Sequence, residues 1–172
     1  MSEIYLKIKG VDGDVTDEKY VKHIHVLSLS LGGINPSSTK VGVQAGSAAG
    51  GGKVIMEDVS FMKVCDRSTP SLTTNFFAGK HFEEFEFKYV VSRGTTSDTF
   101  KTIKLTDVLI TGFHHSGESG GGREAAAKGD LPLEKIAVNF AKIEIGYRPR
   151  KTEGGFDDPL KSGYNVALAR PA

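Results

Sequence analysis

The sequence predicts a mainly β domain, of the sandwich or barrel type, with one helix. Segments in which apolar side chains recur at every second residue occur at least seven times along the 172 residues, as expected for strands with one buried face. Glycine-rich segments connect them, and one stretch has helical spacing and capping residues instead. A chain of this length fits a single domain, residues 1–172, that can bury a sizeable core without metals or disulfides.

The first two predicted strands lie in residues 4–8 and 23–33. In the first, the apolar side chains are Ile4, Leu6 and Ile8. In the second, one face carries His25, Leu27, Leu29 and Leu31, and the other carries Ile24, Val26, Ser28 and Ser30. The second face is small and partly polar, which suits contact with solvent or with a lumen.

Five more segments alternate in the same way, at residues 53–64, 82–91, 98–113, 134–149 and 163–169. In the first of these, a bulge or bend is predicted before Phe61. Two others change phase, one between Thr102 and Ile103 and the other near Ala141. A bulge at each point would keep the apolar side chains on the core face.

One helix is predicted at about residues 69–78. It is defined by the possible N-caps Ser68 and Thr69, by Pro70 in the first turn, and by Gly79 as the stop. Leu72 and Phe76 form a narrow apolar stripe, so the helix is expected on the barrel surface or across one end. Residues 123–129 favour a single helical turn within a long loop at 117–130.

Residues 44–54, QAGSAAGGGKV, resemble a phosphate-binding loop at first sight. The P-loop pattern G-x-x-x-x-G-K-[ST], aligned on Lys53, requires glycine where this chain has Ser47 and a hydroxyl where it has Val54. The residues that follow alternate like a strand, whereas a P-loop opens a helix. We therefore interpret the segment as a loop that binds no nucleotide.

Composition argues against several classes of partner. The 22 Lys and Arg residues nearly balance 21 Asp and Glu residues, for a net charge of +1, whereas nucleic-acid binding needs a basic stripe. No apolar stretch approaches the about 20 residues of a membrane span, and the N-terminus lacks the features of a Sec signal peptide. The single cysteine, Cys65, cannot form an internal disulfide, which favours folding in a reducing cytoplasm.

Histidines supply the candidate metal ligands. His23 and His25 form an H-x-H pair, which a strand would present on one side, but the sequence nominates no third ligand. His114 and His115 are adjacent, so a strand would point them to opposite sides. We interpret both pairs as ordinary polar side chains and keep a metal-dependent enzyme as a hypothesis to test.

Catalytic sets are equally incomplete. Cys65 would need a base such as His81 within hydrogen-bond reach, and Ser28 and Ser30 lie in no G-x-S-x-G elbow. The three glutamates between residues 83 and 86 alternate with phenylalanines, as on an exposed strand face. We expect no enzymatic activity, no metal and no cofactor.

Several segments together resemble a known family. In chain order they are IYLKIKGVDGD, HIHVLSLSLGG, GGKVIMEDVSFMKVCDRSTPSL with GKH after it, VLITGFHHSGESGGG, VNFAKIEIGYRP and GYNV. Their order and spacing are similar to those of the haemolysin-coregulated protein (Hcp) family, from about residue 4 to residue 166. The block at 58–81 is the most specific part.

The resemblance implies a small β-barrel of two packed antiparallel sheets with one flanking helix, assembled as a homohexameric ring. Rings of this family stack into the inner tube of the bacterial type VI secretion system, which a contractile sheath propels, and they carry or chaperone effector proteins in the lumen. The implied partners are other copies of the chain, effectors, and the spike and sheath proteins. The implied location is the bacterial cytoplasm before firing, and the exterior or a target cell afterwards.

The resemblance also nominates site residues. VLSLSLGG matches a family strand that lines the lumen, so Ser28 and Ser30 are candidate effector contacts. The long loop after this strand contributes to contacts around or between rings in the family. Its candidate residues are Ala45, Gly46, Ser47, Gly50, Gly51 and Gly52. Glycine permits the excursions such a loop needs, and we expect residues 35–52 to be mobile in isolated rings and more ordered in stacks.

The alternative is a β-sandwich that binds a ligand, for instance a carbohydrate, without catalysis. The absence of tryptophan from the sequence and the scarcity of clustered aromatic residues weigh against a sugar-stacking face. The loop at 117–130 is richer in helix-forming residues than the family pattern, so its role in a ring stays open.

Overall fold

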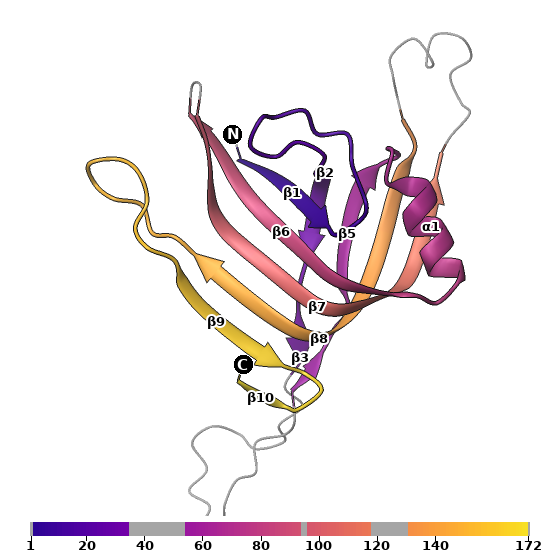
Figure 1. The fold of residues 1–172 in the computed structure, drawn as a ribbon. Helices are drawn as coiled ribbons and strands as arrows, with labels where there is room; N and C mark the ends of the chain where they lie inside the picture. The colour runs from indigo at the N-terminus through magenta and orange to yellow at the C-terminus, as the bar shows by residue number, and fades with distance from the viewer. Residues whose placement is uncertain (1, 35–53, 94–95, 118–130, 172) are drawn as a thin grey trace, which may run out of the picture.

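The computed structural model describes residues 2–34, 54–93, 96–117 and 131–171. These residues are mainly β with one helix, as the sequence predicts (Figure 1). The elements are β1 (Ser2–Ile8), β2 (Ile24–Ser30), β3 (Gly33–Ile34), β4 (Ile55–Met56), β5 (Val59–Val64), α1 (Thr69–Phe77), β6 (His81–Arg93), β7 (Thr96–Ser116), β8 (Leu133–Tyr147), β9 (Leu160–Asn165) and β10 (Arg170–Pro171).

Six antiparallel strands close into a barrel. Their order is β1, β2, β5, β8, β7 and β6, and β6 returns to β1. Strand β8 makes the closure possible because it pairs with β7 along its length, with β5 through residues 133–138, and with β9 through residues 142–147. Strands β9 and β10 extend the sheet beyond the barrel, and β3 and β4 form a separate two-stranded sheet. The expected small β-barrel is confirmed.

The barrel interior holds one apolar core. Phe61, Phe85 and Phe87 are almost fully buried, and their rings meet edge to face with centroids 5.4–6.4 Å apart. This geometry suits the charge distribution of aromatic rings, and each fully buried side chain of this size contributes about 1.5–3 kcal/mol. All six barrel strands and Leu72 of α1 supply members of the core.

Helix α1 begins and ends close to the predicted residues. Ser68 is at the N-cap position, but its hydroxyl donates to Asp66 Oδ1 at 2.5 Å and does not cap the helix. At the other end Gly79 has φ 59. Its N–H donates to the Phe76 carbonyl at 3.1 Å, and the Lys80 N–H donates to the Asn75 carbonyl at 3.0 Å. This pair of bonds is a Schellman motif, which favours glycine at the position with positive φ.

The helix lies on the barrel surface, as expected from its narrow apolar stripe. Leu72 is fully buried, and the Phe76 ring stacks on Phe113 of β7 with centroids 6.2 Å apart. Phe77, the last helical residue, points away and is exposed.

The structure corrects the predicted phase of β2. Its register with β5 shifts between Val26 and Ser28, so Leu27 forms a bulge and is 47% exposed. Val26 is buried before the bulge, and Leu29 packs on the core after it. Leu27 and Leu29 therefore do not share a face, because the extra residue of the bulge reverses the alternation.

Two other predicted strands are shorter than expected. The segment 53–64 is interrupted at Glu57 and Asp58, between β4 and β5, in agreement with the irregularity predicted before Phe61. The last strand ends at Asn165, and residues 166–169 form a turn. This turn is held by the Leu168 N–H, which donates to Asn165 Oδ1 at 2.9 Å, so the alternation read at 163–169 does not continue as a strand.

The first predicted phase change is a bulge, but at another position. The register of β6 with β7 shifts at Tyr89 and Val90, so Phe100 of β7 is the extra residue, whereas the sequence placed the bulge between Thr102 and Ile103. The second predicted phase change lies in β8, where the buried residues are even-numbered up to Phe140 and the next buried apolar residue is Ile143. The opposite strand β7 has an irregular backbone at the same level, at Asp107, whose φ is 54°.

Candidate functional site

Four small residues form a row across the outer face of the barrel. Ser30 of β2 is in register with Ser60 of β5, Ser60 with Ala137 of β8, and Ala137 with Gly112 of β7. Cross-strand partners share a face, so these four residues, here called the small-residue row, lie side by side on four strands. A Cβ at Gly112 would lie 3.4 Å from the Ala137 Cβ. The side chains of the row are small and uncharged.

A second row lies beside it and carries larger polar groups. Ser28 is in register with Met62, Met62 with Lys135, and Lys135 with His114. Ser28 and Ser30 are both exposed, so the structure places both predicted residues on the outer face, two positions apart. Such a surface offers weak, adaptable contacts and lacks the convergent polar groups of a small-molecule pocket.

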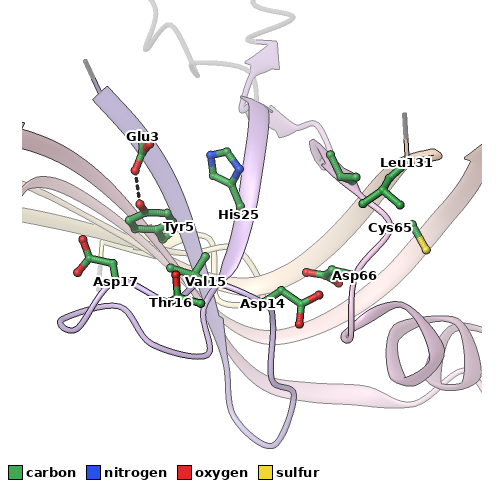
Figure 2. A pocket seen from close by; sticks show the side chains of 11 residues that line it. Glu3, Tyr5, Asp14, Val15, Thr16, Asp17, His25, Cys65, Asp66 and Leu131 are labelled. Carbon is green, nitrogen blue, oxygen red and sulfur yellow. Dashed lines mark hydrogen bonds between the residues drawn. The ribbon is translucent and has the colours of Figure 1, made fainter. Parts of the chain in front are cut away.

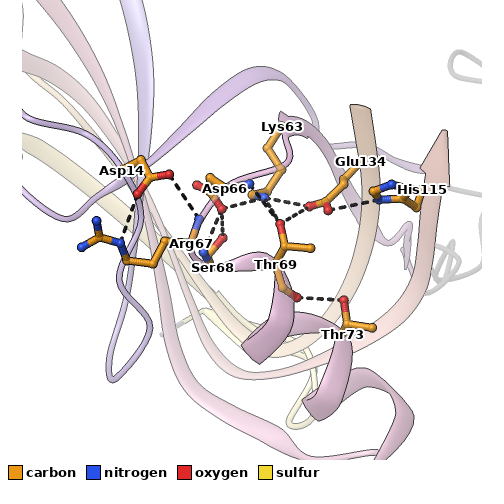
Figure 3. A network of polar contacts seen from close by, with 9 residues as sticks. All are labelled: Asp14, Lys63, Asp66, Arg67, Ser68, Thr69, Thr73, His115 and Glu134. Carbon is orange, nitrogen blue, oxygen red and sulfur yellow. Dashed lines mark hydrogen bonds and ion pairs between the residues drawn. The ribbon is translucent and has the colours of Figure 1, made fainter. Parts of the chain in front are cut away.

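A buried ionic cluster joins β5, β8 and the start of α1 (Figure 3). Lys63 Nζ donates to Glu134 Oε2 at 2.7 Å and to Thr69 Oγ1 at 3.1 Å, and it lies 2.9 Å from Asp66 Oδ1. The Thr69 hydroxyl donates in turn to Glu134 Oε2 at 3.1 Å. The side chains of Lys63 and Glu134 are 0% exposed. Buried charges of this kind persist only when they are paired and hydrogen-bonded.

Sequence reasoning missed this cluster, although the alternation contained a signal. Lys63 continues the buried positions of Val59 and Phe61, and Glu134 precedes the buried Ile136 and Val138 by the same step of two. Two opposite charges at core positions of two strands predict a buried pair. His115 extends the cluster to β7, with Nδ1 3.3 Å from Glu134 Oε1.

An acidic pocket opens beside the cluster, between the 9–23 connection, β1, β2 and β5 (Figure 2). Its volume is about 620 Å³. Its lining includes the carboxylates Glu3, Asp14, Asp17 and Asp66, together with Tyr5, Val15, His25, Cys65 and Leu131. The Tyr5 hydroxyl donates to Glu3. Burial raises the pKa of Tyr5, and the bond to Glu3 and the negative charges of Glu3 and Asp17 raise it further.

The two histidines of the candidate metal pair both lie near Tyr5 but differ in burial. His23 is buried, with its ring against Tyr5 and Tyr20, whereas His25 is exposed at the acidic pocket. His23 Nδ1 donates to the Val21 carbonyl at 3.2 Å, and Nε2 has no partner. In the described residues no three His, Cys, Asp or Glu side chains are grouped as a metal site.

The catalytic candidates Cys65 and His81 have different surroundings. His81 Nδ1 contacts Asp107 Oδ1 at 2.7 Å, and Cys65 lines the acidic pocket. Glu83 and Glu84 pair with Lys9 and Lys104 at 2.6 and 2.8 Å on the barrel exterior, as predicted for an exposed face.

The six candidate loop residues from Ala45 to Gly52 lie outside the described residues, as does most of the 117–130 loop. Within the described ranges, no helix has the length and apolar character that crossing a membrane requires.

Comparison with known proteins gives this fold a family. A family model described as "Type VI secretion system effector, Hcp" matches residues 5–147. The chain belongs to the Hcp family. Protein hcp1 of Pseudomonas aeruginosa is 30% identical to it over 165 residues, which are 95% of this chain and 94% of that protein.

Solved Hcp structures share the fold. One, described as a type six secretion system protein, superposes with a TM-score of 0.86 at 24% identity and covers all of both chains. Hcp1 from Salmonella typhimurium superposes with a TM-score of 0.73 at 23% identity over 99% of each chain. Family membership favours the secretion hypothesis over a ligand-binding sandwich.

Proposed function

We propose that this Hcp protein is a structural tube subunit of the type VI secretion system. Its copies form homohexameric rings that stack into the secreted inner tube and carry or chaperone effector proteins in the lumen. Its partners are other copies of itself, the effectors, and the spike and sheath proteins. It resides in the bacterial cytoplasm before firing and is then secreted.

The observation that carries this proposal is the small-residue row. Ser30, Ser60, Ala137 and Gly112 give four adjacent strands a surface of small, neutral side chains, which suits a channel that passes different proteins without binding them tightly. We place this face toward the lumen, with Ser28 and Ser30 as effector contacts. The candidates for contacts around or between rings remain Ala45, Gly46, Ser47, Gly50, Gly51 and Gly52.

Assembly is tested on the purified protein by native mass spectrometry and electron microscopy. We expect a mass near six protomers and annular particles, because a closed heterologous contact generates a ring. A monomer at high concentration, together with no tube in cells, contradicts the proposal.

The direction of the small-residue row is tested by labelling a single cysteine. In a Cys65→Ser background, Ser30→Cys is compared with Thr74→Cys, which lies at an exposed position of α1. In assembled tubes we expect a small maleimide to label both variants, and a maleimide on a large polyethylene glycol chain to label only Thr74→Cys. Equal labelling by the large reagent places Ser30 outside the lumen.

A further inference from the structure

The second row of the outer face carries the charge that the small-residue row lacks. It consists of Ser28 of β2, Met62 of β5, Lys135 of β8 and His114 of β7, which are cross-strand partners in that order. Each of them lies two positions along its strand from a member of the small-residue row, so both rows point to the same side of the sheet. We call these four residues the cationic row.

The charge of Lys135 is not neutralised within the described part of the chain. Lys135 is exposed, and its ammonium forms no hydrogen bond or ion pair with any described residue. The preceding Glu134 points into the barrel and pairs with Lys63. Asp58, at the start of β5, accepts hydrogen bonds from Thr111 at 2.5 Å and from Asn139 at 2.9 Å. Asn139 is about 13 Å from Lys135 along β8, at about 3.3 Å per residue, so Asp58 is too far away to pair with it.

Met62 and His114 give the cationic row an adaptable contact surface on either side of the charge. Met62 is partly buried, and the flexible thioether of methionine packs against partners of different shape. The His114 ring extends toward the small-residue row, since a Cβ at Gly112 would lie 3.9 Å from His114 Nε2. A molecule that lies on the small-residue row therefore also meets the imidazole, which can form a hydrogen bond with it.

In a ring, every copy would present one Lys135 to the lumen, because the cationic row and the small-residue row share a face. The ammonium groups around one channel then repel each other, and the walls of a channel concentrate the electric field inside it. A protein with carboxylates on its surface relieves this repulsion, whereas a basic protein adds to it. The lumen therefore discriminates between the two.

We propose that the cationic row binds acidic segments of effector proteins, so that this tube carries effectors with an acidic surface in preference to basic ones. The inference rests on the proposed function. Lys135 binds a carboxylate, Met62 packs against an apolar side chain beside it, and Ser28 and His114 supply hydrogen bonds. Each exposed contact is weak, but the copies around a ring act together on one effector. Nucleic acid is a poorer fit, because its phosphates call for several cations from each copy.

Two fluorescent peptides of equal length test this charge preference by fluorescence anisotropy. One alternates glutamate with alanine, the other lysine with alanine, and we expect wild-type rings to bind only the glutamate peptide. Lys135→Glu should weaken that binding roughly tenfold or more, because every copy then repels the peptide, and Lys135→Met should weaken it less. The control Lys80→Glu, at an exposed position after α1, changes the net charge equally and should bind like wild type. Native mass spectrometry verifies that each variant still forms rings.

Protection of a cysteine locates the bound peptide. In the Cys65→Ser background, the glutamate peptide should slow the reaction of Ser30→Cys with a small maleimide and leave that of Thr74→Cys unchanged. If rings form but the peptide does not protect Ser30→Cys, or if Lys135→Glu binds it like wild type, the cationic row is not the binding surface and the tube proposal stands. Tighter binding of a single-stranded oligonucleotide of equal charge would assign the row to nucleic acid and overturn the inference. A wild type that forms no rings contradicts the proposed function itself.

Discussion

Lysine and carboxylate pairs occur in two regions of this barrel that differ in their access to water. In the interior, Lys63 Nζ lies 2.7 Å from Glu134, and both side chains are 0% exposed. On the exterior, Lys104 Nζ lies 2.8 Å from Glu84, and these side chains are 42% and 36% exposed. The distances are nearly equal, but only the interior pair has lost its hydration. Distance therefore says little about what a pair does for stability, and the surroundings decide it.

Breaking the interior pair should have the largest effect. Glu134→Ala removes the main partner of the buried Lys63 ammonium and the contacts of Glu134 with the Thr69 hydroxyl and His115 Nδ1, so we expect the free energy of unfolding to fall by roughly 3–5 kcal/mol. Urea unfolding followed by circular dichroism measures it. A loss of the size seen for an exposed pair would show that water reaches Lys63.

Replacing both interior partners sharpens the interpretation. In the double variant Lys63→Met, Glu134→Leu both charges of the buried pair are removed. Asp66 loses its contact with Lys63 but keeps its bonds from the N–H and hydroxyl of Ser68. We expect it to recover most of the stability lost in Glu134→Ala, because apolar residues replace buried ion pairs at little cost. A loss equal to the sum of the single variants would contradict this view of the cluster.

An intermediate effect is expected at His23, a buried group with no charged partner. Burial holds the pKa of His23 below its usual value, so the folded chain keeps it neutral while the unfolded chain takes up a proton below pH about 6.5. This contribution to stability is fully present above that pH and is lost as the pH falls. In His23→Phe, the decrease in unfolding free energy between pH 7 and pH 5 should be smaller than in the wild type.

A substitution beside His23 that removes no titratable group provides the control for this measurement. Val21 is exposed, and Val21→Ala should leave the decrease in unfolding free energy between pH 7 and pH 5 as it is in the wild type. If wild type and His23→Phe have identical pH profiles, His23 does not contribute to the pH dependence of the unfolding free energy.

The smallest effect is expected for the exterior pair. Lys104→Ala should lower the free energy of unfolding by only about 0.2–1 kcal/mol. The hydrogen bond to Glu84 raises the pKa of Lys104, but both groups remain accessible to water, so added salt should reduce the difference further. If Lys104→Ala lowers the free energy of unfolding as much as Glu134→Ala does, exposure to water does not explain the difference between the exterior and interior pairs.

Local sequence patterns predicted much of the fold. The helix could be placed because Pro70, Gly79 and the Leu72–Phe76 spacing are local signals that the structure uses as expected. The strands could be placed because their apolar residues alternate. The phase error in β2 arose because a bulge at Leu27 depends on the register with β5, which a single strand does not reveal.

The candidate sites were less accessible to sequence reasoning. Ser28 and Ser30 came from a family resemblance, and the row that they join needs Gly112 and Ala137 from two later strands. The acidic pocket brings Glu3, Asp17 and Asp66 together through tertiary contacts, so their spacing along the chain does not predict it. The ionic cluster is different, since the positions of Lys63 and Glu134 in the alternation were visible and were overlooked.

Closure of the barrel also has a consequence for synthesis on the ribosome. Strand β1 ends at Ile8, but its pairing with its second neighbour β6 extends to Val91, so the ribosome must add 83 more residues (91 minus 8) before that pairing is complete. At 5–20 residues per second this takes roughly 4–17 s. During this time one edge of the first strand to be made stays unpaired, which makes the earliest part of the chain the part most dependent on protection from other nascent chains.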